Sequence, residues 1–217
     1  MTSFRTPLFA FAAASVALAT SALAALPAAQ TWQIGPIIKS RNYSHNMPLH
    51  PAATRDGLRI DFPFPDAGAG HVHSVTFQHG PLAGKRRIVM RYRIEASPGT
   101  RFFPQEDPER PATLSLFFQQ RGDTWTARGR YETYRWYAPA AKVIPLTPGE
   151  HAVTIALDDP DWISVWARTA ATQPEGFRAA LADTDRVGFV LGSASARGHG
   201  VFATGPASLI VTAFEVE

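Results

Sequence analysis

The chain has 217 residues, of which 45% are hydrophobic and 11% aromatic, and it contains 18 prolines, 16 glycines and no cysteine. This composition fits one folded β-rich domain and excludes coiled coils, collagen and wholesale disorder. Without cysteine there is no disulfide framework, thiolate zinc site, thiol nucleophile or lipid-bearing cysteine. The net charge is only +3, and the arginines are scattered instead of forming one basic stripe, which argues against a nucleic-acid partner.

The N-terminus is typical of a secretory signal peptide. Arg5 precedes an almost wholly apolar stretch over residues 7–26, and Ala22 and Ala24 have the spacing of a cleavage site. A retained membrane anchor is the alternative, because about 20 apolar residues are enough to span a bilayer. We expect residues 1–24 to be removed. The mature chain, 25–217, is then expected to form one domain without a membrane span, in the periplasm or outside a bacterial cell.

Stretches of alternating polar and apolar residues, separated by Gly and Pro, predict β-strands. The clearest is 86–96, in which Ile88, Met90 and Tyr92 share one face. Further strands are expected at 31–35, 57–64, 73–78, 113–119, 130–137, 151–157, 186–191 and 208–216. A short helix is expected at 174–182, and an exposed loop at 97–111. The pattern therefore predicts an all-β fold, an antiparallel sandwich or barrel with one short helix.

The second half of the chain resembles a known group of domains in its packing residues. The matching segments are 148–155 (PGEHAVTI), 161–162 (DW), 177–181 (FRAAL), 187–192 (VGFVLG), 198–201 (GHGV) and 205–207 (GPA). This pattern resembles the jelly-roll β-sandwich of the galactose-binding-like and carbohydrate-binding-module group, often attached to or encoded beside bacterial polysaccharide-degrading enzymes. The first half is similar only in its strand rhythm. The resemblance implies a jelly roll and non-catalytic recognition of a sugar or another polar ligand.

The segment 125–137 is rich in aromatic residues and is the predicted carbohydrate site. If 130–137 is one strand, its rings cannot all share the core face, so some are expected to stack on sugar C–H faces. Polar partners are expected from the non-core faces of the two clearest strands. The predicted ligand-binding residues are Arg91, Gln119, Trp125, Tyr134 and Trp136. The alternative is that both faces pack, one on the core and one under a loop.

Histidines suggest a rival site. His71 and His73 lie two residues apart on an expected strand, so their rings share a face, as in metal-binding barrels of the cupin type. His79 follows, but Gln78 stands where such a motif would have a carboxylate. The alternative is a pair of solvent-facing imidazoles with Val72 facing the core.

A structural calcium ion is a second candidate, at Asp158, Asp159 and Asp161, where an ordinary acidic turn is the alternative. No other cofactor is predicted. His199, between Gly198 and Gly200, is expected to be a tight-turn residue.

Three classes of function follow, in this order. A non-catalytic module that binds carbohydrate comes first. A jelly-roll polysaccharide-lyase-like or hydrolase-like enzyme comes second, with Tyr134, Arg135, His73 and Arg91 as the residues that would act. It ranks lower because the acidic residues fall mostly in turns and the sequence contains no Gly-x-Ser-x-Gly motif. An exported structural or partner-binding protein comes third.

Overall fold

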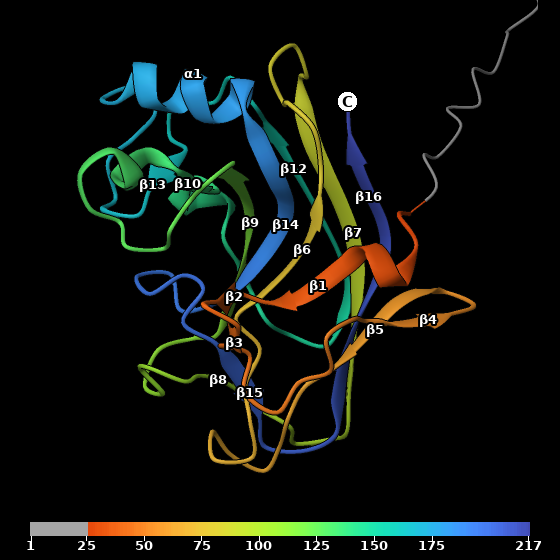
Figure 1. Cartoon of the computed structure of the whole chain (residues 1–217). Helices are drawn as coiled ribbons and strands as arrows, with labels where there is room; N and C mark the ends of the chain where they lie inside the picture. Colours follow the sequence, from red (N-terminus) through yellow and green to blue (C-terminus); the bar gives the residue numbers. More distant parts are fainter. Residues whose placement is uncertain (1–25) are drawn as a thin grey trace, which may run out of the picture.

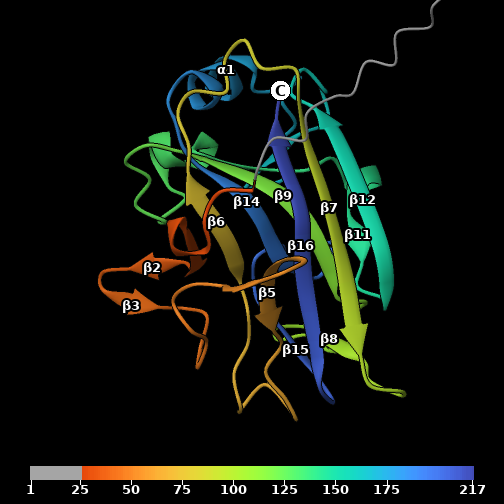
Figure 2. The same ribbon diagram turned by 90° about the vertical axis from the view of Figure 1, so that its right-hand side faces the viewer.

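The alternating stretch around Met90 forms β7 (Arg87–Ala96), in which Ile88, Met90, Tyr92 and Ile94 are buried on one side. This strand belongs to one of two antiparallel sheets that pack face to face in the computed structural model, which describes residues 26–217 (Figures 1 and 2). The predicted signal segment, 1–24, lies outside the described residues. The apolar face of each sheet can leave water only by facing the other, so the strand pattern leads directly to a sandwich.

The larger sheet has seven strands, in the order β1-β6-β14-β9-β10-β13, with β11 beside β9. Its strands are β1 (Trp32–Gly35), β6 (Ser74–Gln78), β9 (Thr113–Gln120), β10 (Arg135–Tyr137), β11 (Ile144–Pro145), β13 (Ile163–Ser164) and β14 (Thr184–Gly192). The smaller sheet has five strands, in the order β12-β7-β16-β5-β4. Besides β7 these are β4 (Ala52–Thr54), β5 (Gly57–Asp61), β12 (Gly149–Ala156) and β16 (Ala207–Val216).

The remaining elements are short. Two small sheets pair β2 (Ile37–Ile38) with β3 (Arg41–Asn42), and β8 (Phe102–Pro104) with β15 (Val201–Ala203). The 3-10 helices are η1 (Ala29–Thr31), η2 (Gly129–Thr133) and η3 (Ala140–Lys142). Helix α1 (Pro174–Ala182) has the predicted bounds, with Pro174 in its first turn, and covers one end of the sandwich (Figure 1). None of the helices within 26–217 is long and apolar enough to cross a membrane.

The chain crosses repeatedly between the sheets. It leaves β5 for β6, returns to β7, crosses to β9, returns to β12 and ends by passing from β14 to β16. Every strand pair is antiparallel. The predicted antiparallel β-sandwich of jelly-roll type with a short helix is confirmed.

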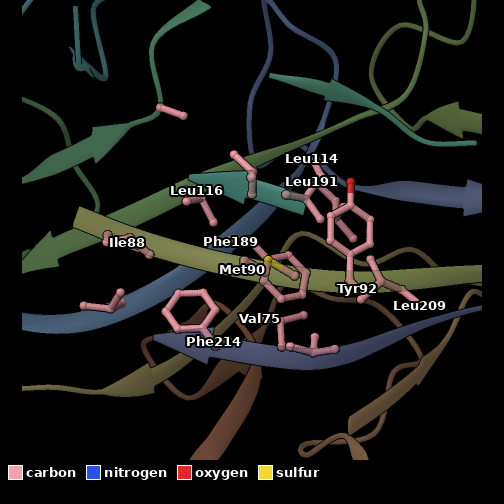
Figure 3. Close-up of a cluster of buried hydrophobic side chains, with 14 of the residues drawn as sticks. Val75, Ile88, Met90, Tyr92, Leu114, Leu116, Phe189, Leu191, Leu209 and Phe214 are labelled. Carbon is pink, nitrogen blue, oxygen red and sulfur yellow. The ribbon is translucent and has the colours of Figure 1, made fainter. Parts of the chain in front are cut away.

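The core lies between the two sheets (Figure 3). Ile88 and Met90 of β7 meet Leu114 and Leu116 of β9, and Phe189 of β14 lies with them. The inward positions predicted on β7, β9 and β12 are all buried. Period-two alternation was a sufficient guide here because a strand places successive side chains on opposite faces.

Two expectations about local structure are wrong. Residues 130–137 are not one strand, because η2 occupies Gly129–Thr133 and leaves only the short β10. Residues 97–111 are not simply a loop, because β8 pairs with β15 there. At 97–111 the strand forms because β15 pairs with it, and local propensity does not report a distant partner.

Trp136 belongs to the core. It is fully buried, its ring centroid lies 4.8 Å from that of Phe177 of α1, and its Nε1–H donates to the carbonyl of Thr133 at 2.7 Å. Tyr134 is only half-buried and packs edge-on against Tyr131. The prediction that Trp136 stacks on a ligand is therefore wrong.

Because Trp136 joins α1 to the larger sheet, Trp136→Ala is expected to lower the free energy of unfolding by about 3–5 kcal/mol. Tyr134→Ala, two positions away on a half-buried ring, is the matched variant and should cost clearly less. Urea denaturation of both variants measures the difference. Equal losses would contradict the assignment of Trp136 to the core.

Candidate functional site

The larger sheet is buried on both faces. All but the last residue of β9 is buried, although Leu114, Leu116 and Phe118 alone face the core. On the opposite face, Phe117 forms a second apolar cluster with Tyr137 and Val190. This outward face is therefore covered by other parts of the chain, and the smaller sheet does not take part.

A cavity of about 560 Å³ lies between the outward face and the segments that cover it. Its floor includes Ser74 of β6, Val190 of β14, and Arg135 and Tyr137 of β10. Its walls come from the β2–β3 hairpin, from Trp125, and from residues 163–167 and 194–199. Figure 2 shows the β2–β3 hairpin projecting beyond this sheet, on the side away from β7 and β16. The volume lies in the range of about 300–1,000 Å³ that is usual for small-ligand sites.

A buried carboxylate organises one wall. The Asp123 side chain is fully buried, and its Oδ1 accepts the backbone N–H of Trp125 at 3.0 Å. Its Oδ2 accepts the Nε2–H of Gln119 at 2.8 Å and lies 2.9 Å from Nε of Arg135. The Arg135 side chain is only 8% exposed, so the two charges are withdrawn from water together.

The Arg135 guanidinium keeps unused donors. Its Nε lies within ion-pair distance of Asp123, but the angle is not that of a hydrogen bond. Its Nη2 is buried and has no hydrogen-bond partner within residues 26–217. Arg135 can therefore still donate a hydrogen bond, although its charge is balanced by Asp123.

The ring of Trp125 packs against Arg135 and Phe117. The guanidinium of Arg135 is 4.6 Å from the centre of its ring, and Phe117 lies nearly parallel to it with a centroid distance of 6.4 Å. Trp125 has a φ of 63°, a left-handed conformation that is unfavourable for residues other than glycine. Ala127 is also left-handed and accepts the indole N–H of Trp166 at 2.8 Å. The ring is thus held in place before any ligand arrives.

A second, smaller cavity of about 40 Å³ lies along the same sheet face. It shares Trp125, Pro36 and Ser74 with the large cavity and adds Gln119 and Arg186. The ring of Trp125 therefore borders both cavities, and the two neighbouring cavities with this ring between them are called the groove below.

Two further arginines border this groove. Arg197, in the large cavity, donates to the backbone carbonyls of Ala138 and Ala194. Burial lowers its pKa to about 10, so it stays charged at neutral pH. Arg186 donates from Nε to the hydroxyl of Thr76 at 2.9 Å and from Nη2 to the carbonyl of the same residue at 3.1 Å. Burial also lowers the pKa of Arg186.

His73 lines the large cavity and lies beside two further histidines, His71 and His45. The ring centroids of His71 and His73 are 4.7 Å apart, and His45 lies 6.0 Å from His71. The Nδ1–H of His73 donates to the carbonyl of Gly198 at 2.6 Å, and burial lowers the pKa of His73 to about 4. The two imidazoles are thus partly buried and uncharged, and the alternative of solvent-facing rings describes them poorly. Val72 faces the core, as expected.

Within residues 26–217 no group of three His, Asp or Glu side chains is placed to hold a metal ion. Asp159 Oδ1 accepts the backbone N–H of Asp161 at 2.9 Å, which is the hydrogen bond of an acidic turn. His199 lies between two glycines of positive φ, as the expected turn requires, and its imidazole pairs with Glu106.

The structure brings together only part of the predicted site. Trp125 borders both cavities, and Gln119 lines the smaller one and contacts Asp123. Tyr134 does not line the large cavity. Arg91 lies on the exposed face of β7, on the far side of the sandwich, so the fold does not bring it to this groove. Alternation correctly placed Arg91 on a non-core face but could not tell which sheet would carry it.

Sequence reasoning missed Asp123, Arg186 and Arg197. Asp123 and Arg197 lie in irregular segments that carry no periodic signal, and Arg186 lies on a strand whose partner was unknown. Their common property is burial of a charge, which only the packed fold reveals.

The residues considered for a lyase do not all lie in one place. His73 and Arg135 share the large cavity, whereas Arg91 lies on the other sheet.

No protein-family model matches the sequence, and no curated protein matches it significantly. Among solved structures, a xylan-binding module CBM15 is similar, with a TM-score of 0.37 and 15% sequence identity over 84% of this chain and 92% of that chain. A likeness of this degree carries no argument about the site, so the function must be argued from the residues of this chain.

Asp123→Asn is expected to lower the free energy of unfolding by about 3 kcal/mol, because it leaves the buried Arg135 without a counter-charge. Asp61→Asn, which breaks the exposed pair with Arg59, is the matched control and should cost less than about 1 kcal/mol. Chemical denaturation measures both. A loss at Asp123 as small as that at Asp61 would show that the pair does not organise the wall.

The buried His73 also makes stability depend on pH. The unfolded chain binds a proton at this residue near pH 6.5, whereas the folded protein binds it only near pH 4. The free energy of unfolding should therefore fall as the pH drops from about 6.5 to about 4, by up to about 3 kcal/mol. His73→Asn keeps a donor for Gly198 and cannot be protonated, so its stability should vary less with pH over this window. An unchanged slope would contradict the burial of His73.

Proposed function

We propose that the protein binds carbohydrate in the groove that Trp125 borders. The observation that carries this proposal is an aromatic ring held rigidly between two cavities, with charged and amide donors beside it. Sugar rings present C–H faces that pack on aromatic rings and hydroxyls that hydrogen-bond to polar side chains. Trp125 supplies the first kind of contact, and Arg197 and Gln119 supply the second.

Rigidity supports this proposal. A ring that becomes ordered only on binding would cost part of the interaction free energy, whereas Trp125 is already fixed by Asp123, Arg135 and Phe117. Maintaining a left-handed backbone at a bulky residue costs about 1–3 kcal/mol, and such strain is concentrated at ligand sites. The large cavity has room for sugar units, whereas the cavity of about 40 Å³ has room only for a small polar group of a neighbouring unit.

The cellular setting of this proposal comes from the sequence. Removal of residues 1–24 would place the domain 25–217 in the periplasm or outside the cell, where polysaccharides are available. We propose a non-catalytic role there, because the groove combines stacking and hydrogen-bonding groups, whereas the residues considered for an enzyme are divided between the two sheets.

Trp125→Ala should reduce affinity for the bound glycan by about 2 kcal/mol or more, because a central stacking ring is removed. Tyr134→Ala is the control. It removes a neighbouring aromatic ring outside the large cavity and should leave binding unchanged. A glycan-array screen of the mature chain identifies the ligand, and calorimetric titration of the two variants measures the effect, with circular dichroism to verify folding.

The outcomes separate the two possible sites. Loss of binding in Trp125→Ala alone supports the groove. Loss in Tyr134→Ala alone would place recognition around η2 instead. No binding of any glycan by the folded wild-type protein would overturn the carbohydrate proposal.

A further inference from the structure

The large cavity is lined by basic side chains and not by carboxylates of the described residues. The ionisable side chains that line it are Arg135, Arg197, His73, His199, Tyr43 and Tyr137, and no carboxylate of residues 26–217 is among its lining. Burial raises the pKa of Tyr137, so that ring stays neutral. At neutral pH the lining therefore carries positive charge and no negative charge of its own.

Two carboxylates pair with residues of the lining, but neither of them pairs with Arg197. Asp123 is fully buried and already paired with Arg135. Glu106 lies outside the lining and pairs with His199. Arg197 is left with two backbone carbonyls as partners, and its Nη2 makes no hydrogen bond within the described residues. Its guanidinium is thus partly buried and has no carboxylate partner among the described residues.

Arg186 repeats this arrangement in the smaller cavity. It bonds only to the hydroxyl and carbonyl oxygens of Thr76, and the neighbouring Asp185 pairs with Arg121 at 3.4 Å. Three exposed arginines of the smaller sheet differ, since Arg59, Arg87 and Arg93 each have a carboxylate within 3 Å. Arg186 and Arg197 lie along the groove without a carboxylate at ion-pair distance in the described part of the chain, whereas these three are neutralised.

We propose that the groove recognises an acidic glycan whose hexuronate carboxylate pairs with Arg197. This inference rests on the proposed carbohydrate binding and names its ligand class. A partly desolvated guanidinium gains most from an ionised acceptor, and the planar carboxylate matches its donors. The apolar part of the lining would meet the C–H faces of the same sugar. Arg186 would pair with the acid of a neighbouring unit.

The test compares each acidic polysaccharide with its own neutral form. Polygalacturonate, alginate and glucuronoxylan are each presented beside the same polymer after reduction of the carboxyl groups, in affinity electrophoresis and calorimetric titration. At least one native polymer is expected to bind about tenfold or more tightly than its reduced form, as loss of a charge-assisted hydrogen bond predicts. The preference should shrink in high salt.

Two variants locate the effect. Arg197→Gln should abolish the preference for the native polymer, whereas Arg197→Lys keeps the charge and should retain part of it. Arg91→Gln removes an exposed arginine from the opposite sheet and should leave the preference intact. If Arg197→Gln does not fold, Arg197→Lys together with the salt dependence still tests the pairing.

Each result has a distinct meaning. Equal binding of native and reduced polymers would overturn the acidic-glycan inference while leaving carbohydrate binding in place. Binding of sulfated glycans alone would overturn the carboxylate assignment. Loss of the preference in Arg91→Gln, but not in Arg197→Gln, would place it outside the groove. No binding of any polymer by the folded protein would overturn both proposals.

Discussion

The buried carboxylate of Asp123 is the constraint on which the candidate site depends. Three groups converge on it, namely the backbone N–H of Trp125, the amide of Gln119 and the guanidinium of Arg135. A charge withdrawn from water needs such partners, and these interactions with Asp123 order the loop after β9. The position of the Trp125 ring is a consequence, because Asp123 holds the backbone and Arg135 holds the ring.

The site also depends on the unequal use of the two sheets. The smaller sheet covers the core with one face and presents paired charges to water with the other, as an antiparallel sheet commonly does. The larger sheet buries both faces, since Phe117, Tyr137 and Val190 need cover on the side away from the core. The segments that cover these residues also form the walls of the groove, so the packing of this face builds the candidate site.

The sequence predictions were more accurate where one face of an element is buried than where both faces are. Strand β7 and helix α1 were predicted well, because a periodic apolar face reports burial directly. Trp136 and Arg91 were misplaced for a related reason. Alternation says that two residues lie on opposite faces of a strand, but not which face is covered or which sheet contains the strand. Trp125 was identified by its aromatic surroundings, although it lies on a loop and not on a strand.

The sequence by itself determined the fold class, the core strands and the region of the chain that carries the aromatic candidate. These properties are local, since they follow from the repeat of apolar residues along one segment. Only the tertiary structure decided which charges are buried and how each is paired, and therefore that Arg186, Arg197 and Asp123 lie at the groove. Burial and hydrogen bonding of these charges depend on segments far apart in the chain, such as Thr76 and Arg186, which are 110 positions apart, and no local pattern encodes them.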